Sequence, residues 1–219
     1  MGKSKCGGNN MTIFYHGGAS RPVLENIREA CPSLTHGNGF TPSYYYDREH
    51  PYFLDNGAFT SDFNPEKWKE MLDEVLKFDS NPDFVVLPDV FDNPQKTFDR
   101  ARKYVIEVQK RDMPYYYVAQ KPESAFQAIH KAIELGADGV FIGGSWDWKQ
   151  REAPKIINLA HENGLKAHIG MPNDYYWAYT TGADSMDSVT IGRNEDYNRA
   201  RNLENKINSQ KSLNQVIEK

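Results

Sequence analysis

Short apolar segments alternate with helix-forming segments along most of the 219 residues. The apolar segments are rich in β-branched and aromatic residues, which favour strands. The expected strands are 12–18, 33–37, 51–57, 84–90, 115–120, 139–144, 166–171 and 185–192. Helix signals lie between them, such as Asn-Pro at 64–65 and 93–94 and stop glycines at 136 and 164. The expected helices are 21–31, 64–78, 93–111, 122–136, 151–164, 173–182 and a polar C-terminal helix in 195–219.

This alternation predicts a parallel sheet, because consecutive strands joined by a helix run in the same direction. Eight strand–helix units close into a (β/α)₈ TIM barrel, which is the α/β fold that we expect here as a single domain. If the weak segment 33–37 is not a strand, an open doubly wound sheet of seven strands remains an alternative. No G-x-G-x-x-G follows the first expected strand, which disfavours a dinucleotide-binding domain.

Composition limits the class of protein. The hydrophobic content of 39% supports one domain over residues 11–219, with residues 1–10 expected to be a disordered leader. No apolar run approaches the ~18 residues of a membrane span, so we expect a cytoplasmic protein without membrane contact. The two cysteines, 6 and 31, form no CxxC pair and exclude a disulfide framework or a cysteine-rich zinc site. A net charge of −4 argues against a broad electrostatic grip on nucleic acid.

Polar residues follow or end most of the expected strands. In a barrel the carboxyl ends of the strands form one face, where the chemistry of TIM-barrel enzymes takes place. The residues at these positions are Asp55, Asp89, Gln120, Gly143, Gly144, His168, Met171 and Asp187. Several have a plain structural interpretation: Asp55 as a turn residue, Asp89 as a helix cap and Gln120 as a loop residue. Asp187 differs, because a carboxylate inside the last strand needs a partner or a function.

A metal site is a further alternative. Carboxylates and a histidine at one face could hold a metal ion, as in a metal-dependent hydrolase. The candidate ligands are Asp55, Asp89, His168 and Asp187. No paired-histidine motif such as HxH or HExxH occurs, which disfavours this interpretation, and we expect no metal and no cofactor.

The order of the motifs resembles the tRNA-guanine transglycosylase family, whose fold is a (β/α)₈ barrel. Its Asp-Ser-Gly-Gly-Tyr/Phe-Gln pattern resembles DNGAFT, and its purine-reading aspartate resembles the Asp in LPDV. Its Val-Gln and Ile-Gly-Gly strand ends resemble VAQ and IGG, and its Gly-x-Gly-x-Pro-Glu-Asp resembles HIGMPND. Its Gly-Val-Asp-x-Phe-Asp segment with Arg-Asn resembles GADSMDSVTIGRN at the same spacing. The resemblance covers residues from about 52 to 194.

Three departures from the family pattern matter. The C-terminal zinc motif of three cysteines and a histidine is absent, the chain is much shorter than the tRNA enzymes, and Lys-Pro replaces Gly-Gly after the Val-Gln. A short, zinc-free sequence is similar to the phage and bacterial transglycosylases that place 7-deazaguanines in DNA. The expected partners are therefore DNA rather than tRNA, and guanine and 7-deazaguanine bases, in a host cytoplasm if the gene is phage-borne. A homodimer, or a complex with another protein that contributes to DNA binding, remains an alternative to a monomer.

The resemblance also implies a role for each site residue. Asp187 would be the nucleophile and Asp55 would move protons on the bases. The residues that would bind the base are Phe59, Asp89, Gln120, Gly143, Gly144 and Met171. Arg193 would contact a phosphate near the target nucleotide. Three other functions remain open at this point: a tRNA transglycosylase, a nucleoside or N-glycosyl hydrolase, and a noncatalytic nucleic-acid-binding relative.

Overall fold

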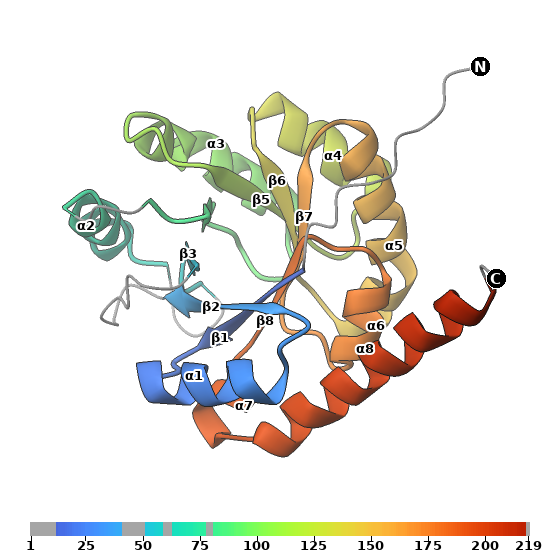
Figure 1. The fold of residues 1–219 in the computed structure, drawn as a ribbon. Helices are drawn as coiled ribbons and strands as arrows, with labels where there is room; N and C mark the ends of the chain where they lie inside the picture. The colour runs from blue at the N-terminus through green and yellow to red at the C-terminus, as the bar shows by residue number, and fades with distance from the viewer. Residues whose placement is uncertain (1–11, 41–50, 59–62, 78–80, 218–219) are drawn as a thin grey trace.

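The computed structural model describes residues 12–40, 51–58, 63–77 and 81–217. Its strands form a closed parallel barrel in the order β1 to β8, with the helices outside it (Figure 1). The strands are β1 (Ile13–Gly17), β2 (Thr35–Phe40), β3 (Tyr52–Leu54), β4 (Phe84–Val86), β5 (Tyr115–Ala119), β6 (Gly139–Ile142), β7 (Lys166–Ile169) and β8 (Ser185–Ser188). Because β1 pairs with both β2 and β8, the barrel is closed, and the predicted (β/α)₈ fold is confirmed over the open sheet.

The helices begin where the sequence supplies caps. Asn64, Asn93 and Ser124 each accept backbone N–H groups of the first helical turn with their side chains. The helices are α1 (Arg21–Ala30), α2 (Pro65–Val75), α3 (Pro94–Gln109), α4 (Ala125–Glu134), α5 (Trp146–Glu162), α6 (Tyr175–Thr180), α7 (Thr190–Asn194) and α8 (Tyr197–Ile217). The C-terminal helix α8 packs against α1, α6 and α7 (Figure 1). Within the part of the chain that the structure describes, no helix is long and apolar enough to cross a membrane.

Aromatic side chains fill the inside of the barrel. Alternate residues of each strand point inward, and the inner cluster comprises Tyr15, Phe53, Phe84, Val86, Tyr116 and Val118. The rings of Phe84 and Tyr116 stack with centroids 3.9 Å apart. Glycines make room for these rings, because a Cβ at Gly139 would lie 2.7 Å from the ring of Tyr116. This packed aromatic layer fills the barrel up to the carboxyl ends of the strands and forms the bottom of the cavity that lies there.

Two boundaries differ from the sequence expectation. Helix α5 begins at Trp146 rather than 151, because Ser145 is extended and Trp148 already packs into the core between the barrel and its helices. The last strand ends at Ser188 rather than 192, and the short helix α7 follows. At this turn Oγ of Ser188 accepts the backbone N–H of Thr190 at 3.0 Å, and Gly192 lies close to β1, where a Cβ would be 3.3 Å from that of His16. The first boundary changes the site, because it places Lys149 on a helix instead of in a loop.

Candidate functional site

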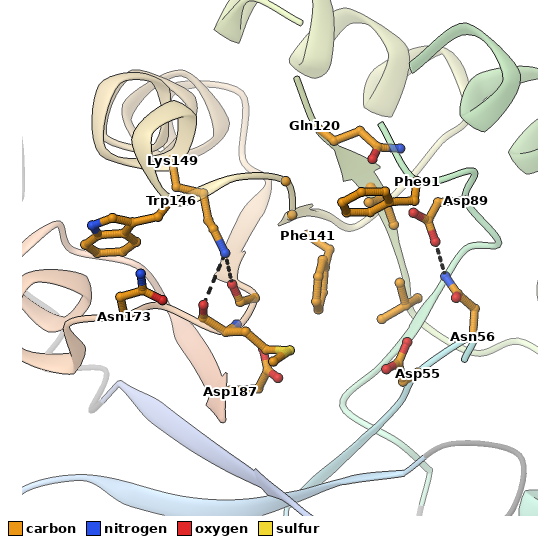
Figure 2. Close-up of a pocket in the computed structure, with 16 residues that line it drawn as sticks. Asp55, Asn56, Asp89, Phe91, Gln120, Phe141, Trp146, Lys149, Asn173 and Asp187 are labelled. Carbon is orange, nitrogen blue, oxygen red and sulfur yellow. Dashed lines mark hydrogen bonds between the residues drawn. The ribbon is translucent and has the colours of Figure 1, made fainter. Parts of the chain in front are cut away.

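A cavity of about 320 Å³ opens at the carboxyl ends of the strands (Figure 2). It is lined by Asp55, Asn56, Val86, Asp89, Phe91, Val118, Gln120, Phe141, Gly143, Gly144, Trp146, Lys149, Gly170, Met171, Asn173 and Asp187. The structure therefore brings together the candidate residues Asp55, Asp89, Gln120, Gly143, Gly144, Met171 and Asp187, which come from six strand ends. Three carboxylates share this small space, which is more negative charge than packing alone would place together.

Asp187 is held on one side only. It is 8% exposed and points inward from β8. Its Oδ1 accepts hydrogen bonds from Nε2 of His168 at 3.0 Å and from the backbone N–H of Met171 at 2.9 Å. No group among the described residues donates to its Oδ2. One carboxylate oxygen is thus fixed in place while the other stays available to a bound molecule.

His168 orients Asp187 from inside the barrel, and both of its ring nitrogens have hydrogen-bond partners, which disfavours a role as a metal ligand. It is fully buried in the barrel, stacked on Phe141 with ring centroids 4.6 Å apart. Burial lowers the pKa of His168, so the ring is neutral, although its hydrogen bond with Asp187 opposes this shift. A neutral ring that donates from Nε2 to Asp187 must accept at Nδ1, where the hydroxyl of Ser185 lies at 2.9 Å.

Asp55 follows β3 in a turn that also contains Gly57. Its Oδ1 accepts the backbone N–H of Gly57 at 3.3 Å, so the turn interpretation describes part of its role. Burial raises the pKa of Asp55 to about 7, and the negative charges of Asp187 and Asp89 add to the increase. A carboxyl group with this pKa exchanges its proton near neutral pH, as a general acid and base must.

Asp89 does not cap a helix. Helix α3 is capped by Asn93, whose side chain accepts the N–H of Lys96 at 3.1 Å. Asp89 instead accepts a hydrogen bond at Oδ1 from Nδ2 of Asn56 at 3.0 Å (Figure 2). Burial raises the pKa of Asp89, and the hydrogen bond from Asn56 partly offsets this. Asn56, for which no role was predicted, therefore positions Asp89 at the cavity wall.

Gln120 lines the cavity but its amide is already used. Its Nε2 donates to the carbonyl of Val90 at 2.8 Å and to Oγ1 of Thr97 at 2.6 Å, and its Oε1 accepts the N–H of Asp92 at 2.8 Å. These contacts hold the loop between β4 and α3, so the structure gives Gln120 a loop-anchoring role in place of an open amide.

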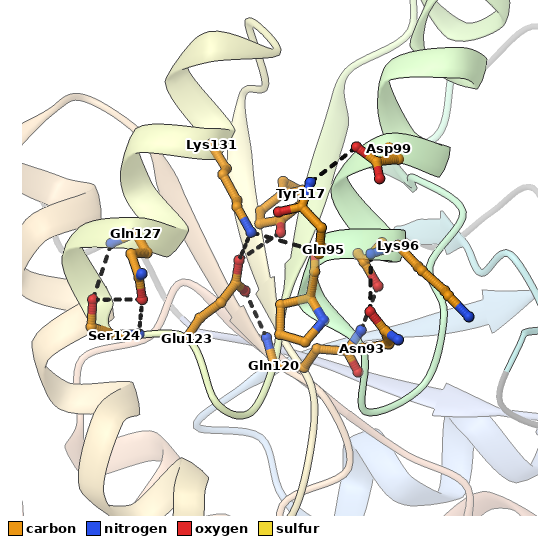
Figure 3. Close-up of polar contacts among 12 residues, drawn as sticks. Asn93, Gln95, Lys96, Asp99, Tyr117, Gln120, Glu123, Ser124, Gln127 and Lys131 are labelled. Atoms are coloured by element: carbon orange, nitrogen blue, oxygen red, sulfur yellow. Dashed lines mark hydrogen bonds and ion pairs between the residues drawn. The ribbon is translucent and has the colours of Figure 1, made fainter.

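Glu123 stabilises the carboxyl end of β5, where Gln120 lies. It is buried and accepts hydrogen bonds from the hydroxyl of Tyr117 at 2.8 Å, from Nζ of Lys131 at 2.7 Å and from the N–H of Gln120 at 3.2 Å (Figure 3). The hydroxyl of Tyr117 and the N–H of Gln120 would otherwise be buried without a partner, whereas Lys131 also donates to the carbonyl of Pro94. This network lies outside the cavity lining and fixes the backbone that carries Gln120.

The glycine pair after β6 differs residue by residue. The N–H of Gly143 donates to the carbonyl of Ala119 at 2.9 Å, whereas that of Gly144 has no acceptor among the described residues. Gly144 has φ +80°, where a side chain is disfavoured. The site therefore has one open backbone donor at this position, at Gly144.

The other predicted residues have different outcomes. Met171 lies at the cavity wall and is 43% exposed. Arg193 is exposed on α7 and is not among the residues that line the cavity. Phe59 lies outside the described residues, so its predicted stacking role stays a prediction.

Lys149 is the functional residue that the sequence interpretation missed. It is 5% exposed, and its Nζ donates to the carbonyls of Gly170 at 2.6 Å and Met171 at 3.2 Å (Figure 2). Burial lowers the pKa of Lys149 to about 8, while the charge of Asp187 opposes the shift. The available signal was Ser145, a residue type that favours helix starts, shortly before Trp148, which packs in the core; a helix that begins there places Lys149 in its first turn rather than in a loop.

The metal hypothesis is not supported by the geometry. Among the residues that the structure describes, no three histidine, cysteine, aspartate or glutamate side chains are arranged to hold a metal ion. The four candidate ligands have other partners: His168 bonds Asp187, and Asp89 bonds Asn56. The arrangement instead combines a fixed carboxylate, a carboxyl group that titrates near neutral pH, and a lysine.

Comparison with known proteins adds information on the fold. No family model matches the chain, and no curated protein matches it. Among solved structures it is similar to orotidine 5'-monophosphate decarboxylase from Sulfolobus solfataricus (TM-score 0.54, 11% identity, 91% of this chain and 98% of that chain). It is also similar to tryptophan synthase from Pyrococcus furiosus (TM-score 0.53, 12% identity, 90% and 96%). At such low identity these similarities show the barrel fold alone.

Proposed function

We propose that the protein is a transglycosylase that exchanges guanine in DNA for a 7-deazaguanine base through a covalent intermediate on Asp187. The observation that supports this most is the state of Asp187: Oδ1 is held by His168 and Met171, and Oδ2 is open in a cavity that also contains Asp55 and Asp89. A fixed carboxylate with one open oxygen suits attack on a sugar carbon. The choice of DNA over tRNA rests on the sequence resemblance.

The reaction consists of two displacements at C1′ of the target nucleotide. In the first, Oδ2 of Asp187 bonds to C1′ while the C1′–N9 bond breaks, and the bonding electrons leave with guanine. Asp55 donates its proton to the departing base. In the second, the incoming base gives its N9 proton to Asp55, its nitrogen bonds to C1′, and Asp187 is released as a carboxylate. The raised pKa of Asp55, about 7, allows both proton transfers near neutral pH.

The two walls of the cavity differ in hydrogen-bonding character, and a guanine ring has matching edges. Asp89 provides acceptors for the N1–H and exocyclic amine of the base. On the β6 side, the open N–H of Gly144 provides a donor for the O6 carbonyl. Since the amide of Gln120 is occupied, we assign Gln120 to holding the β4–α3 loop and not to O6. The target nucleotide must leave the base stack to enter the cavity.

Asp89→Asn is expected to weaken guanine binding by about 10- to 100-fold, the effect of losing a hydrogen bond to a charged group. The asparagine can still accept from Asn56, so the wall keeps its shape while one acceptor toward the base becomes a donor. Isothermal titration calorimetry with guanine measures the effect. Asp92→Asn is the matched control, because Asp92 is exposed and does not line the cavity. Equal guanine affinity in Asp89→Asn and wild type would refute the role of Asp89.

The whole proposal is tested by incubating the protein with DNA and with tRNA separately, each with labelled guanine or a labelled 7-deazaguanine. Nucleoside mass spectrometry then detects the incorporated base. Incorporation into DNA supports the proposal, and incorporation into tRNA alone reassigns the substrate. Release of guanine without incorporation indicates an N-glycosyl hydrolase, since water would then complete the second displacement. Exchange that is lost with a chelator and restored by zinc would contradict the metal-free mechanism.

A further inference from the structure

One peptide group links Lys149 to Asp187. The carbonyl of Gly170 accepts from Nζ of Lys149 at 2.6 Å, and the N–H of the same peptide group, on Met171, donates to Oδ1 of Asp187 at 2.9 Å. In a trans peptide the C=O and N–H point in opposite directions. This peptide therefore lies between the cation and the carboxylate and is hydrogen-bonded at both ends. Figure 2 shows the two hydrogen bonds that Lys149 donates.

The backbone at this peptide is in a conformation that needs support. Met171 has φ +43°, a left-handed value that residues other than glycine adopt rarely and at a cost. Nζ of Lys149 stabilises this conformation with a second hydrogen bond, which it donates to the carbonyl of Met171 at 3.2 Å. Without Lys149, the carbonyl of Gly170 would lose its hydrogen bond at a buried site and that of Met171 at a partly buried one.

We propose that Lys149 is a positioning residue: by holding the Gly170–Met171 peptide it keeps the N–H of Met171 on Oδ1 of Asp187 and so presents Oδ2 to the substrate. This inference rests on the proposed function for its catalytic part, and on the structure alone for the positioning. Hydrogen bonds from a charged donor are roughly twice as strong as neutral ones. A cation on the carbonyl also polarises the peptide and strengthens its N–H as a donor.

The charge of Lys149 gives the inference a pH signature. With a pKa of about 8, Lys149 loses its charge as the pH rises from 7 to 9.5, so its grip on the peptide weakens in that range. The titratable groups around it are Asp187 on β8 and His168 on β7, with Asp55 and Asp89 in the same cavity. His168 stays neutral over this range, because burial lowers its pKa. Asp55, with a pKa of about 7, titrates at its lower edge and must be separated from Lys149 by the choice of substrate.

The first test does not depend on any activity. Amide hydrogen exchange of Met171, measured by NMR at pH 7, is expected to become about tenfold faster or more in Lys149→Met, while the amides of β7 keep their protection. Lys155→Met is the control, because Lys155 lies exposed on the same helix and pairs with Glu152. If Lys149→Met exchanges the Met171 amide at the wild-type rate, the positioning role is refuted.

The second test connects the positioning to chemistry. Single-turnover adduct formation is measured on DNA containing 7-methylguanine, whose departure needs no proton from Asp55. The N1–H of 7-methylguanine in DNA also ionises in this pH range and slows both proteins, so the readout is the ratio of the wild-type rate to the Lys149→Met rate at each pH. This ratio is expected to be highest near pH 7 and to fall toward one as the pH rises through about 8, the pKa of Lys149, with an unchanged half-saturating DNA concentration. A ratio that stays constant from pH 7 to 9.5 would overturn the inference.

A third variant protects against misfolding. If Lys149→Met does not fold, Lys149→Ala is tested with n-propylammonium chloride, which can occupy the space of the lost side chain. Recovery of Met171 protection with this amine, and not with sodium chloride, supports positioning by the charge, and no recovery contradicts it. If wild type forms no adduct at any pH, the proposed function fails, while the amide measurements still decide the role of Lys149.

Discussion

Asp187→Asn is expected to lower base exchange by about a thousandfold or more, because it removes the attacking oxygen while preserving the shape of the side chain. The asparagine carbonyl can still accept from Nε2 of His168 and the N–H of Met171, so the fold and the loop are retained. Exchange is measured by nucleoside mass spectrometry. Wild type mixed with target DNA is expected to give a denaturant-resistant protein–DNA band, and the variant to give none.

Asp184→Asn is the matched control for this experiment. Asp184 lies three residues earlier, before the amino end of β8, and accepts from the ring of His161 at 2.9 Å and from the N–H of Ala167 at 2.8 Å. It is therefore a structural residue at the face opposite the cavity. Its variant is expected to retain exchange even where the melting temperature falls. Near wild-type exchange in Asp187→Asn would show that Asp187 is structural as well, and the proposed mechanism would fail.

Asp55→Asn is expected to lower exchange by about 10²- to 10³-fold, the usual contribution of a general acid and base. In wild type the sign of the pH effect differs between the two displacements. Departure of guanine needs the protonated carboxyl, which is lost as the pH rises above about 7, and capture of the new base needs the carboxylate, which is lost as the pH falls below about 7. Exchange is therefore expected to be fastest near pH 7 and to decline on both sides.

A change of leaving group separates proton transfer from structural damage. 7-Methylguanine leaves as a neutral molecule without a proton, so adduct formation on DNA containing it should be affected much less by Asp55→Asn than adduct formation on ordinary guanine. The ratio of the two single-turnover rates, measured in wild type and variant, is the readout. If the variant loses both rates equally, Asp55 shapes the turn with Gly57 and does not move protons.

The aromatic cluster inside the barrel explains why the pKa values of the cavity residues are shifted. The stacked rings below the cavity exclude water from the inside of the barrel. Carboxylates at the edge of such a layer are poorly solvated, which is the main reason for the raised pKa of Asp55 and Asp89. The same burial lowers the pKa of Lys149. Burial at this face thus raises the pKa of the two aspartates and lowers the pKa of Lys149.

The barrel, and the face of it on which the polar residues gather, could be predicted from the amino-acid sequence. Strand and helix patterns repeat with their own periods, and parallel strands place all carboxyl ends at one face, so Asp55, Asp89 and Asp187 could be predicted to converge. The prediction worked because it depended on local periodicity and on topology. It also placed Asp187 inside the last strand.

What each side chain does at that face depends on tertiary contacts that could not be predicted from the sequence. The full use of the Gln120 amide by Val90, Thr97 and Asp92 depends on how the β4–α3 loop folds back, which no spacing encodes. The contact of Lys149 with Gly170 and Met171 joins two neighbouring strand–helix units across 21 and 22 residues of sequence. Hydrogen bonds and pKa shifts depend on distances of a few ångströms and on burial, and these are fixed only when the whole barrel packs.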